Sequence, residues 1–152
     1  MKKALFLDRD GTINVDVGYV HRIEDFTFIP GIFEFCVLAQ RLGYLIIVIT
    51  NQSGIERGYF TEVEYQDVTA YMIAEFARRG VTVTDVFHCP SLEGYDRKPN
   101  PGLFLKAQSK YDIDMHSSIS IGDKERDVKA GEAAGVGHNF LFQGVYPDIT
   151  GW

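Results

Sequence analysis

The sequence has few cysteines, no long apolar run and no excess of positive charge. Cys36 and Cys89 are its only cysteines, too few for a disulfide framework. The longest apolar run, Tyr44 to Ile49, has six residues, whereas a membrane-spanning helix needs about 20. The 15 basic residues are outnumbered by 21 acidic ones, for a formal net charge of −6. The basic footprint of a nucleic-acid-binding domain is therefore absent.

These absences predict a cytoplasmic protein without a membrane or nucleic-acid partner. Lys2 and Lys3 are followed by only four apolar residues before Asp8, too short a run for the core of a signal peptide. Two cysteines without a secretory signal favour a reducing compartment. Cys36 lies in an apolar helical pattern, and we expect it to be a buried free thiol. The acidic net charge leaves room for a small anionic ligand that is held locally.

The chain contains enough apolar residues for one folded domain. Of its 152 residues, 45% are hydrophobic and 13% aromatic, and a chain of this length buries about 68–70% of the surface that its unfolded form exposes. No repeat, low-complexity tract or linker divides it. We therefore expect residues 1–152 to form a single monomeric domain, with little length left for a second folded cap.

Five apolar runs alternate with helical patterns along the chain. The runs, at 4–7, 45–49, 82–88, 118–121 and 139–142, read as strands. The helical patterns are an apolar stripe from Ile32 to Leu42, a stripe after the capping box of Thr61 and Glu64, a helix with Asn100 as N-cap and Pro101 as first residue, and a short helix from Glu125 to Ala134. This alternation predicts a doubly wound parallel α/β sheet, Rossmann-like in architecture. Ligands of such sheets bind beyond the carboxyl ends of the strands.

Two carboxylates follow the first predicted strand. Asp8 and Asp10 stand two residues apart, and their mutual repulsion is relieved by a cation or a proton. Mg²⁺ suits this role because it takes oxygen ligands and retains positions for water and substrate phosphate. An Asx turn is the structural alternative. A calcium loop of the EF-hand kind does not fit, because Phe6 stands where an acid is required and the closing Glu is missing.

Polar residues follow the next strands as well. Residues 50–54 bring hydroxyl and amide groups that can hold a phosphoryl group, although a simple polar turn has the same composition. Arg97 and Lys98 place two cations before the N-terminus of a predicted helix. The helix dipole disfavours cations there, which indicates an anion between them and the helix. A solvated basic loop is the alternative.

Two more acids follow the fourth predicted strand. Asp123 comes directly after Gly122 and is a candidate for a third oxygen ligand. Asp127 lies one helical turn further and faces the same side. It is either a functional residue or an acid that complements the helix dipole, and the sequence leaves this choice open.

The four strand ends together resemble the haloacid dehalogenase (HAD) superfamily of phosphatases. Its four motifs are matched by Asp8-x-Asp10-Gly11-Thr12, Thr50, Lys98 and Gly122-Asp123-x3-Asp127. From about residue 4 to 142, the chain resembles more closely the heptose bisphosphate phosphatase and histidinol-phosphatase branch of that superfamily. This closer resemblance rests on residues 8–14, 18–21, 50–55, 57–58 and 97–99. Residues 18–21 and 52–55 favour the heptose enzymes.

The resemblance implies a HAD fold and Mg²⁺-dependent hydrolysis of a sugar phosphate. The first choice of reaction is D-glycero-D-manno-heptose 1,7-bisphosphate to the 1-phosphate; histidinol phosphate or another small phosphomonoester is the alternative substrate. Asp8 would attack phosphorus and form an aspartyl-phosphate, and Asp10 would act as general acid and then as general base. Thr50 and Lys98 would hold the phosphoryl oxygens. Mg²⁺ would be bound by Asp8, the backbone carbonyl of Asp10, and Asp123.

The same resemblance implies a set of substrate contacts around this centre. The residues are Asp16, Val17, Gly18, Tyr19, Asn51, Gln52, Ser53, Arg57, Arg97 and Lys124. Among them Arg97 is the candidate for the second phosphate of a bisphosphate. Residues 13–28 are the only substantial stretch outside the predicted core. We expect them to form a small flap in place of a cap domain, over an open active site.

The sequence departs from this branch between the third strand and Arg97. Close relatives carry a zinc loop with four Cys and His ligands there, whereas this chain retains only His88 and Cys89, with Ser91 at an expected ligand position. Neighbouring residues of a strand point to opposite faces, and structural zinc needs four ligands. We therefore expect no zinc. Val17 also departs from the branch, where a polar residue is usual.

A phospho-accepting receiver domain of signalling proteins is a rival from another functional class. It shares the doubly wound fold and the use of Asp, Mg²⁺ and Lys, but its phosphorylated Asp follows a central strand. Here the third predicted strand ends at His88 and Cys89 without an acid, and the second ends at Thr50. A nucleic-acid 3′-phosphatase shares the chemistry, but the acidic balance of the chain argues against it. The sequence therefore favours the small-molecule phosphatase.

Overall fold

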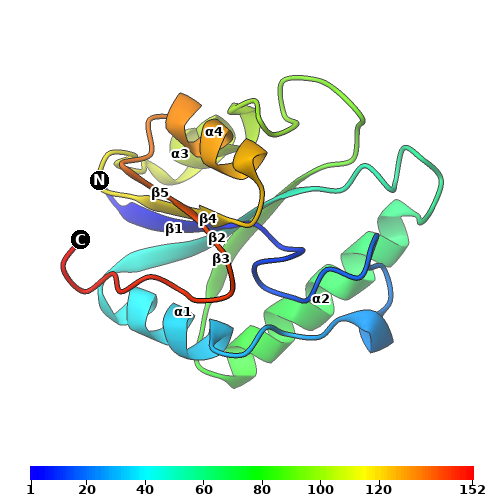
Figure 1. The fold of residues 1–152 in the computed structure, drawn as a ribbon, viewed down its shortest axis with the longest axis horizontal. Coiled ribbons are helices and arrows are strands. Elements are labelled where there is room, and N and C mark those ends of the chain that lie inside the picture. Colours follow the sequence, from blue (N-terminus) through cyan, green and yellow to red (C-terminus); the bar gives the residue numbers. More distant parts are fainter.

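Five parallel strands form one sheet in the computed structural model, which describes all residues 1–152 (Figure 1). The strands are β1 (Lys3–Leu7), β2 (Tyr44–Asn51), β3 (Val83–Cys89), β4 (Ile119–Gly122) and β5 (His138–Leu141), in the spatial order β3-β2-β1-β4-β5. The helices are α1 (Ile32–Arg41), α2 (Glu62–Arg78), α3 (Gly102–Tyr111) and α4 (Glu125–Ala133), with a short 3₁₀ helix η1 (Ile23–Asp25). The predicted doubly wound α/β fold is confirmed.

The central strand β1 is apolar because it is covered on both faces. Leu5 and Leu7 belong to the core beneath α1 and α2, whereas Ala4 and Phe6 belong to the core beneath α3 and α4. Successive side chains of a strand point to opposite faces, so a strand between two helical layers needs apolar residues at every position. Figure 1 shows the two helical layers on either side of the sheet.

The predicted start of α2 is confirmed, whereas the predicted start of α3 is wrong. Thr61 and Glu64 form the predicted capping box, with Oγ1 of Thr61 3.1 Å from the amide of Glu64. The prediction that Asn100 caps α3 is wrong, because α3 begins at Gly102 with Pro101 at its N-cap. The side-chain amide of Asn100 instead donates to the carbonyl oxygen of Gly94 at 2.9 Å, which stabilises the preceding turn.

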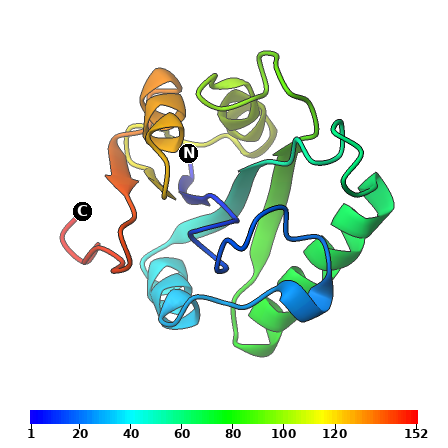
Figure 2. The ribbon, with the colours of Figure 1, turned by 45° about the vertical axis from the view of Figure 1, so that its right-hand side comes forward.

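The flap, residues 13–28, crosses the carboxyl end of the sheet. It contains only η1 as regular structure, and it is anchored by the buried side chains of Ile13, Val20 and Phe26. Figure 2 shows it passing in front of the sheet from the end of β1 to the side of α2. The flap therefore covers one side of the site and leaves the rest of the carboxyl end of the sheet open.

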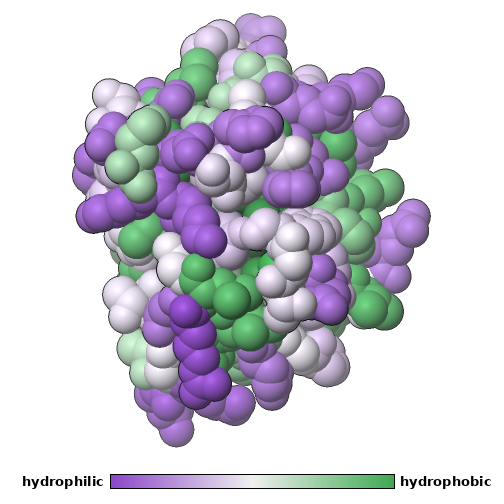
Figure 3. Space-filling view, turned by 90° about the vertical axis from the view of Figure 1, so that its left-hand side faces the viewer, coloured by the Kyte–Doolittle hydropathy of each residue, from purple (hydrophilic) through white to green (hydrophobic).

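The residues after β5 pack back onto the first helical layer. Phe142 and Ile149 are buried, and the ring of Tyr146 stacks on Phe35 of α1 at 5.0 Å. The face that carries both termini is mostly hydrophilic, with hydrophobic areas near its centre and at the right-hand edge of the view (Figure 3). None of the helices is long and apolar enough to cross a membrane. Cys36 is buried in the core without a disulfide, as predicted.

Candidate active site

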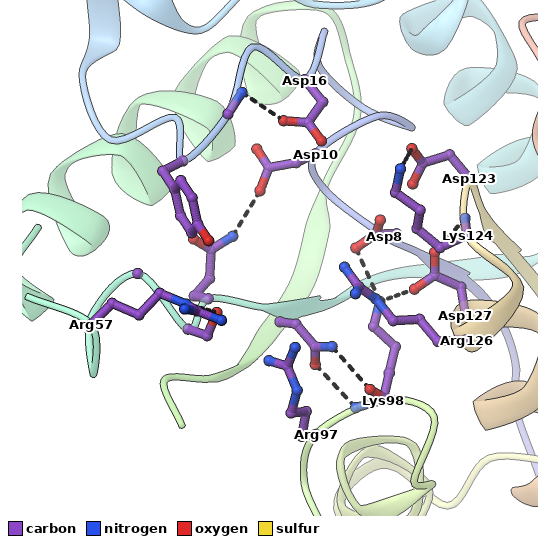
Figure 4. A pocket seen from close by; sticks show the side chains of 16 residues that line it. Asp8, Asp10, Asp16, Arg57, Arg97, Lys98, Asp123, Lys124, Arg126 and Asp127 are labelled. Atoms are coloured by element: carbon purple, nitrogen blue, oxygen red, sulfur yellow. Dashed lines mark hydrogen bonds and ion pairs between the residues drawn. The ribbon is translucent and has the colours of Figure 1, made fainter. Parts of the chain in front are cut away.

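The carboxyl ends of β1, β2 and β4 converge on a strongly polar pocket of about 290 Å³. It lies where the strand order changes direction from β1 to its neighbour β4, the position at which doubly wound sheets bind ligands. Figure 4 shows side chains from several elements pointing into it. The lining residues are Asp8, Asp10, Asp16, Gly18, Tyr19, Asn51, Gln52, Ser53, Gly54, Arg57, Arg97, Lys98, Asp123, Lys124, Arg126 and Asp127.

Lys98 is the buried cation at the floor of the pocket. Its side chain is 2% exposed, and Nζ lies 3.0 Å from Oδ1 of Asp8 and 2.7 Å from Oδ1 of Asp127. Nζ also donates to the carbonyl oxygen of Ile49 at 2.7 Å. Burial by itself would lower the pKa of Lys98, but the two carboxylates outweigh it and the pKa is raised. Lys98 therefore stays charged and links the ends of β1, β2 and α4.

Three carboxylates gather beside Lys98 in a form that fits a cation. Asp8, Asp123 and Asp127 each offer an oxygen atom, and these atoms lie within 4.8 Å of one another. Burial, followed by the nearby carboxylate of Asp127, raises the pKa of Asp123. Oδ1 of Asp123 is buried and has no hydrogen-bond partner. Oxygen ligands of this kind suit Mg²⁺, and the unpartnered Oδ1 of Asp123 is free to bind a cation.

Burial and neighbouring carboxylates disfavour the charged form of Asp8. Burial, opposed by Lys98 and reinforced by Asp127 and Asp10, raises its pKa well above the ordinary value. A cation beside the carboxylates favours their charged form and reverses this shift. Gly11 leaves the space that this arrangement needs, because a Cβ atom there would lie 2.1 Å from Oδ2 of Asp123.

Asp10 is held by a dense set of donors. Its Oδ1 accepts hydrogen bonds from Arg9 and, at 3.0 Å, from Asn14. Its Oδ2 accepts one from Nε2 of Gln52 at 2.9 Å. The side chain is 21% exposed and lines the pocket. Its orientation is therefore fixed while one edge stays accessible.

The last two residues of β2, Thr50 and Asn51, support the site. Thr50 is fully buried and does not line the pocket. Its Oγ1 accepts a hydrogen bond from Nε2 of Gln52 at 2.9 Å, so Gln52 bridges Thr50 and Asp10. Asn51 exchanges two hydrogen bonds with the backbone of Lys98, at 3.0 and 3.1 Å. The end of β2 thus positions the loop that carries the lysine.

Four cations surround the pocket mouth. Arg57, Arg97, Lys124 and Arg126 come from three separate segments and all line the pocket (Figure 4). The sequence predicted the first three, whereas Arg126 was not predicted. A signal for it existed, because Arg126 is a cation in the first turn of α4, where the helix dipole disfavours positive charge. The pocket mouth is therefore electropositive above an acidic floor.

The structure brings together all predicted site residues except two. Thr50 is buried and does not itself line the pocket, although its Oγ1 contacts the lining residue Gln52. Val17 is 66% exposed on the flap, outside the pocket lining. Asp127 makes one contact at the start of α4 and another inside the pocket. Its Oδ2 accepts from the amide of Lys124 at the start of α4, at 3.0 Å, and its Oδ1 pairs with Lys98.

His88 and Cys89 point to opposite sides of β3, as the strand geometry predicts. Nε2 of His88 lies 2.8 Å from Oε1 of Glu62, and its ring stacks on Tyr65 of α2. Cys89 is buried in the other core, beneath α3 and α4. The two side chains therefore do not converge on a common metal position.

The chain is similar to known phosphatases along most of its length. The HAD-hydrolase-like family model matches residues 95–148. A D-glycero-alpha-D-manno-heptose-1,7-bisphosphate 7-phosphatase of Campylobacter jejuni is 49% identical over 89% of this chain and 79% of its own length. The corresponding beta-heptose enzyme of Vibrio cholerae is 47% identical over 92% of this chain and 81% of its own length.

A solved structure has the same fold. The D,D-heptose 1,7-bisphosphate phosphatase of B. bronchiseptica, complexed with magnesium and phosphate, is 29% identical and superposes with a TM-score of 0.85. The match covers 91% of this chain and 79% of that one. The carboxylate cluster and the buried lysine agree with these similarities. The chain therefore belongs to the heptose-1,7-bisphosphate 7-phosphatase family of HAD phosphatases.

Proposed function

We propose that this protein removes the 7-phosphate of D-glycero-D-manno-heptose 1,7-bisphosphate and leaves the 1-phosphate. The observation that carries the proposal is the pocket itself, in which Asp8 and Asp10 lie beneath a mouth lined by four cations. The relatives are named for this reaction, in both its alpha and its beta form. The pocket is open and polar, as a small doubly phosphorylated sugar requires.

Asp8 is the nucleophile of the proposed reaction. Its Oδ1 is held by Lys98, which leaves Oδ2 to attack phosphorus and form an aspartyl-phosphate. Asp10 donates a proton to the departing sugar oxygen and later takes one from the attacking water. Lys98 lies beside the reacting centre, where its positive charge stabilises the charge that develops on the phosphoryl oxygens.

The carboxylates of Asp8 and Asp123 and the backbone carbonyl of Asp10 would hold Mg²⁺. Bound there, the ion would neutralise the repulsion between the nucleophile and the substrate phosphate. Asp127 orients Lys98 through its 2.7 Å ion pair and stands at the edge of the same cluster. Thr50 supports Gln52 from its buried position.

Arg97 and Arg126 are the proposed contacts of the second phosphate. They come from the loop before α3 and from α4, and both line the mouth of the pocket. An arginine binds phosphate through a planar fork of donors. Tyr19 and Asp16 of the flap line the pocket as well, in the position for contacts to the sugar.

Conservative changes at the two aspartates test the assigned chemistry. Asp8→Asn removes the nucleophile, and we expect Mg²⁺-dependent phosphate release to fall to background. Asp10→Asn removes proton transfer, which contributes about 10²–10⁴-fold in enzymes of this kind. Wild-type activity in either variant would contradict these roles. Asp67→Asn, an exposed acid of α2, is the matched control and should leave phosphate release unchanged.

A substrate panel tests the identity of the sugar. We expect kcat/KM to be highest for one anomer of heptose 1,7-bisphosphate and lower for histidinol phosphate and fructose 1,6-bisphosphate. Arg97→Ala and Arg126→Ala should each raise KM for the bisphosphate about 10-fold or more, since a charged hydrogen bond contributes about 1.5–3 kcal/mol. The same variants should leave p-nitrophenyl phosphate, which has no second phosphate, nearly unaffected. Equal kcat/KM for all sugars would point to a broad phosphatase.

We infer further that the protein holds no structural zinc, because His88 and Cys89 face different sides of β3. Metal analysis of the purified protein should find much less than one zinc per chain. Stoichiometric zinc would contradict the inference.

A further inference from the structure

A buried arginine joins the flap to Asp10. Arg9 is 1% exposed, which is rare for a cation. Its Nε and Nη2 both donate to Oδ1 of Asp10, at 3.1 and 2.9 Å. Nη2 also donates to the carbonyl oxygen of Val20 in the flap, at 2.8 Å. One side chain therefore contacts both the flap and the carboxylate to which proton transfer is assigned.

The guanidinium is held in place by aromatic rings from two elements. The centres of Phe26 in the flap and Tyr65 in α2 both lie 5.8 Å from Cζ of Arg9. A cation near aromatic faces is attracted by their negative electrostatic potential. A buried charge also needs a nearby counter-charge, and Asp10 provides it. Neither partner can rotate away without leaving the other unpaired.

This arrangement makes the two oxygens of Asp10 unequal. Oδ1 accepts from Nε and Nη2 of Arg9 and from Nδ2 of Asn14. A guanidinium can only donate, so Oδ1 is restricted to accepting and has no position for a proton. Oδ2 accepts only from Gln52, and it keeps a lone pair that can bind one.

We propose that Arg9 is the positioning residue for proton transfer: it ties Oδ1 of Asp10 to the flap, so that Oδ2 carries the exchanged proton. The inference rests on the proposed function of Asp10. In the first half-reaction Oδ2 gives its proton to the sugar oxygen as the bond from phosphorus to that oxygen breaks and the bond to Asp8 forms. In the second, Oδ2 takes a proton from water as the water oxygen attacks phosphorus and Asp8 leaves as a carboxylate.

The leaving group separates this role from a purely structural one. p-Nitrophenolate departs without a proton, so phosphorylation of Asp8 by p-nitrophenyl phosphate does not need the acid form of Asp10. Hydrolysis of the aspartyl-phosphate still needs Asp10 as the base. A misplaced Asp10 therefore gives fast phosphorylation followed by slow turnover, whereas a loosened fold slows both steps together.

Arg9→Lys is the test variant, because it keeps the charge but cannot donate twice to Oδ1. With p-nitrophenyl phosphate and Mg²⁺ in a stopped-flow instrument, we expect a burst of p-nitrophenol at nearly the wild-type rate. Steady-state turnover should fall about 10-fold or more, and the phosphorylated chain should accumulate in intact-mass spectra. With heptose 1,7-bisphosphate, both the phosphorylation and the turnover should be slow.

Two further variants complete the experiment. Asn14→Ala removes one donor to Oδ1 without leaving a buried charge, and it should show the same pattern with a smaller loss. It decides the question by the same criteria if thermal unfolding shows that Arg9→Lys does not fold. Arg22→Lys changes an exposed arginine of the same flap and should behave as wild type.

The outcomes separate this inference from the function on which it rests. A burst and turnover that fall in parallel, or an unaltered Arg9→Lys enzyme, would overturn the role of Arg9 and leave the function intact. A wild-type enzyme that forms no phosphorylated Asp8 from either substrate would overturn the proposed function and the role of Arg9 with it.

Discussion

Several single residues of this site are buried charged side chains, and each depends on a counter-charge beside it. Lys98 and Asp127 are 2% and 5% exposed, and each is the counter-charge of the other. Removing one member of a buried pair leaves an uncompensated charge, which is strongly destabilising. A loss of activity on changing Lys98 would therefore combine chemistry and folding. Residues that shape the site without carrying charge give cleaner tests.

Gly11→Ala tests the shape of the carboxylate cluster. A Cβ atom at Gly11 would meet Oδ2 of Asp123 at 2.1 Å, and the glycine has φ +90°. We expect the variant to lose at least about 10-fold in apparent Mg²⁺ affinity, as disturbed ligand orientation does at metal sites, measured from the Mg²⁺ dependence of phosphate release. Gly58→Ala is the control, since it has φ +79° and open space around it. An equal Mg²⁺ dependence of the two variants would show that backbone strain, and not contact with Asp123, is responsible.

Asp85 of β3 joins this strand to the end of α3. Its Oδ2 accepts from Nζ of Lys110 at 2.8 Å and from the hydroxyl of Tyr111 at 2.6 Å, both at the end of α3. Burial acts to raise the pKa of Asp85, but these hydrogen bonds outweigh it and the pKa is lowered. The ion pair of Asp85 with Lys110 is partly exposed, so water screens much of its attraction.

Asp85→Asn should therefore destabilise the fold slightly and mainly above acidic pH. A carboxyl group whose pKa is lowered by folding stabilises the folded state above its unfolded pKa of about 3.9. That contribution is lost as pH falls through the folded pKa. We expect a loss of up to about 1 kcal/mol in the free energy of unfolding at pH 7 and a smaller loss at pH 3, below the unfolded pKa. Urea titrations of both proteins at pH 7 and pH 3 measure this loss. An equal loss at the two pH values would argue that the charge of Asp85 is not its cause.

The local patterns located the elements well and their ends less well. Buried runs such as 45–49 and the capping box of Thr61 are local signals, because they depend on residues within one turn or one strand. The N-cap assigned to Asn100 was wrong because its side chain found a partner six residues earlier, in Gly94. A polar side chain before a helix does not reveal which backbone group it will satisfy.

The whole molecule brings three acids to one edge from chain positions that lie far apart. Asp8 follows β1, Asp123 follows β4, and Asp127 lies in the first turn of α4. The strands β1 and β4 pair directly. Their proximity costs free energy that a bound cation recovers. Because only the folded chain assembles the cluster, Mg²⁺ binding should stabilise the whole fold.

Mg²⁺ should therefore raise the melting temperature in a concentration-dependent way. At 100 times its dissociation constant, a ligand that binds only the folded state adds about 2.7 kcal/mol, or roughly 5–10 °C for a chain of this size. Chelation by EDTA should reverse the shift and abolish phosphate release. Differential scanning calorimetry measures the first effect. Asp123→Asn should shift far less than wild type, and an equal shift in that variant would place the ion elsewhere.

The sequence by itself determined the succession of strands and helices along the chain and the polar residues at the strand ends. These are local properties, since a strand buried on both faces must be apolar and the acids that follow it stand out. Only the tertiary structure decided that Thr50 is buried against Gln52 and that Arg126 lines the pocket. It also decided that Asp127 both accepts from the amide of Lys124 at the start of α4 and pairs with Lys98. The reason is physical: the free energy of a buried charge depends on its partners, and sheet order and packing bring those partners from distant parts of the chain.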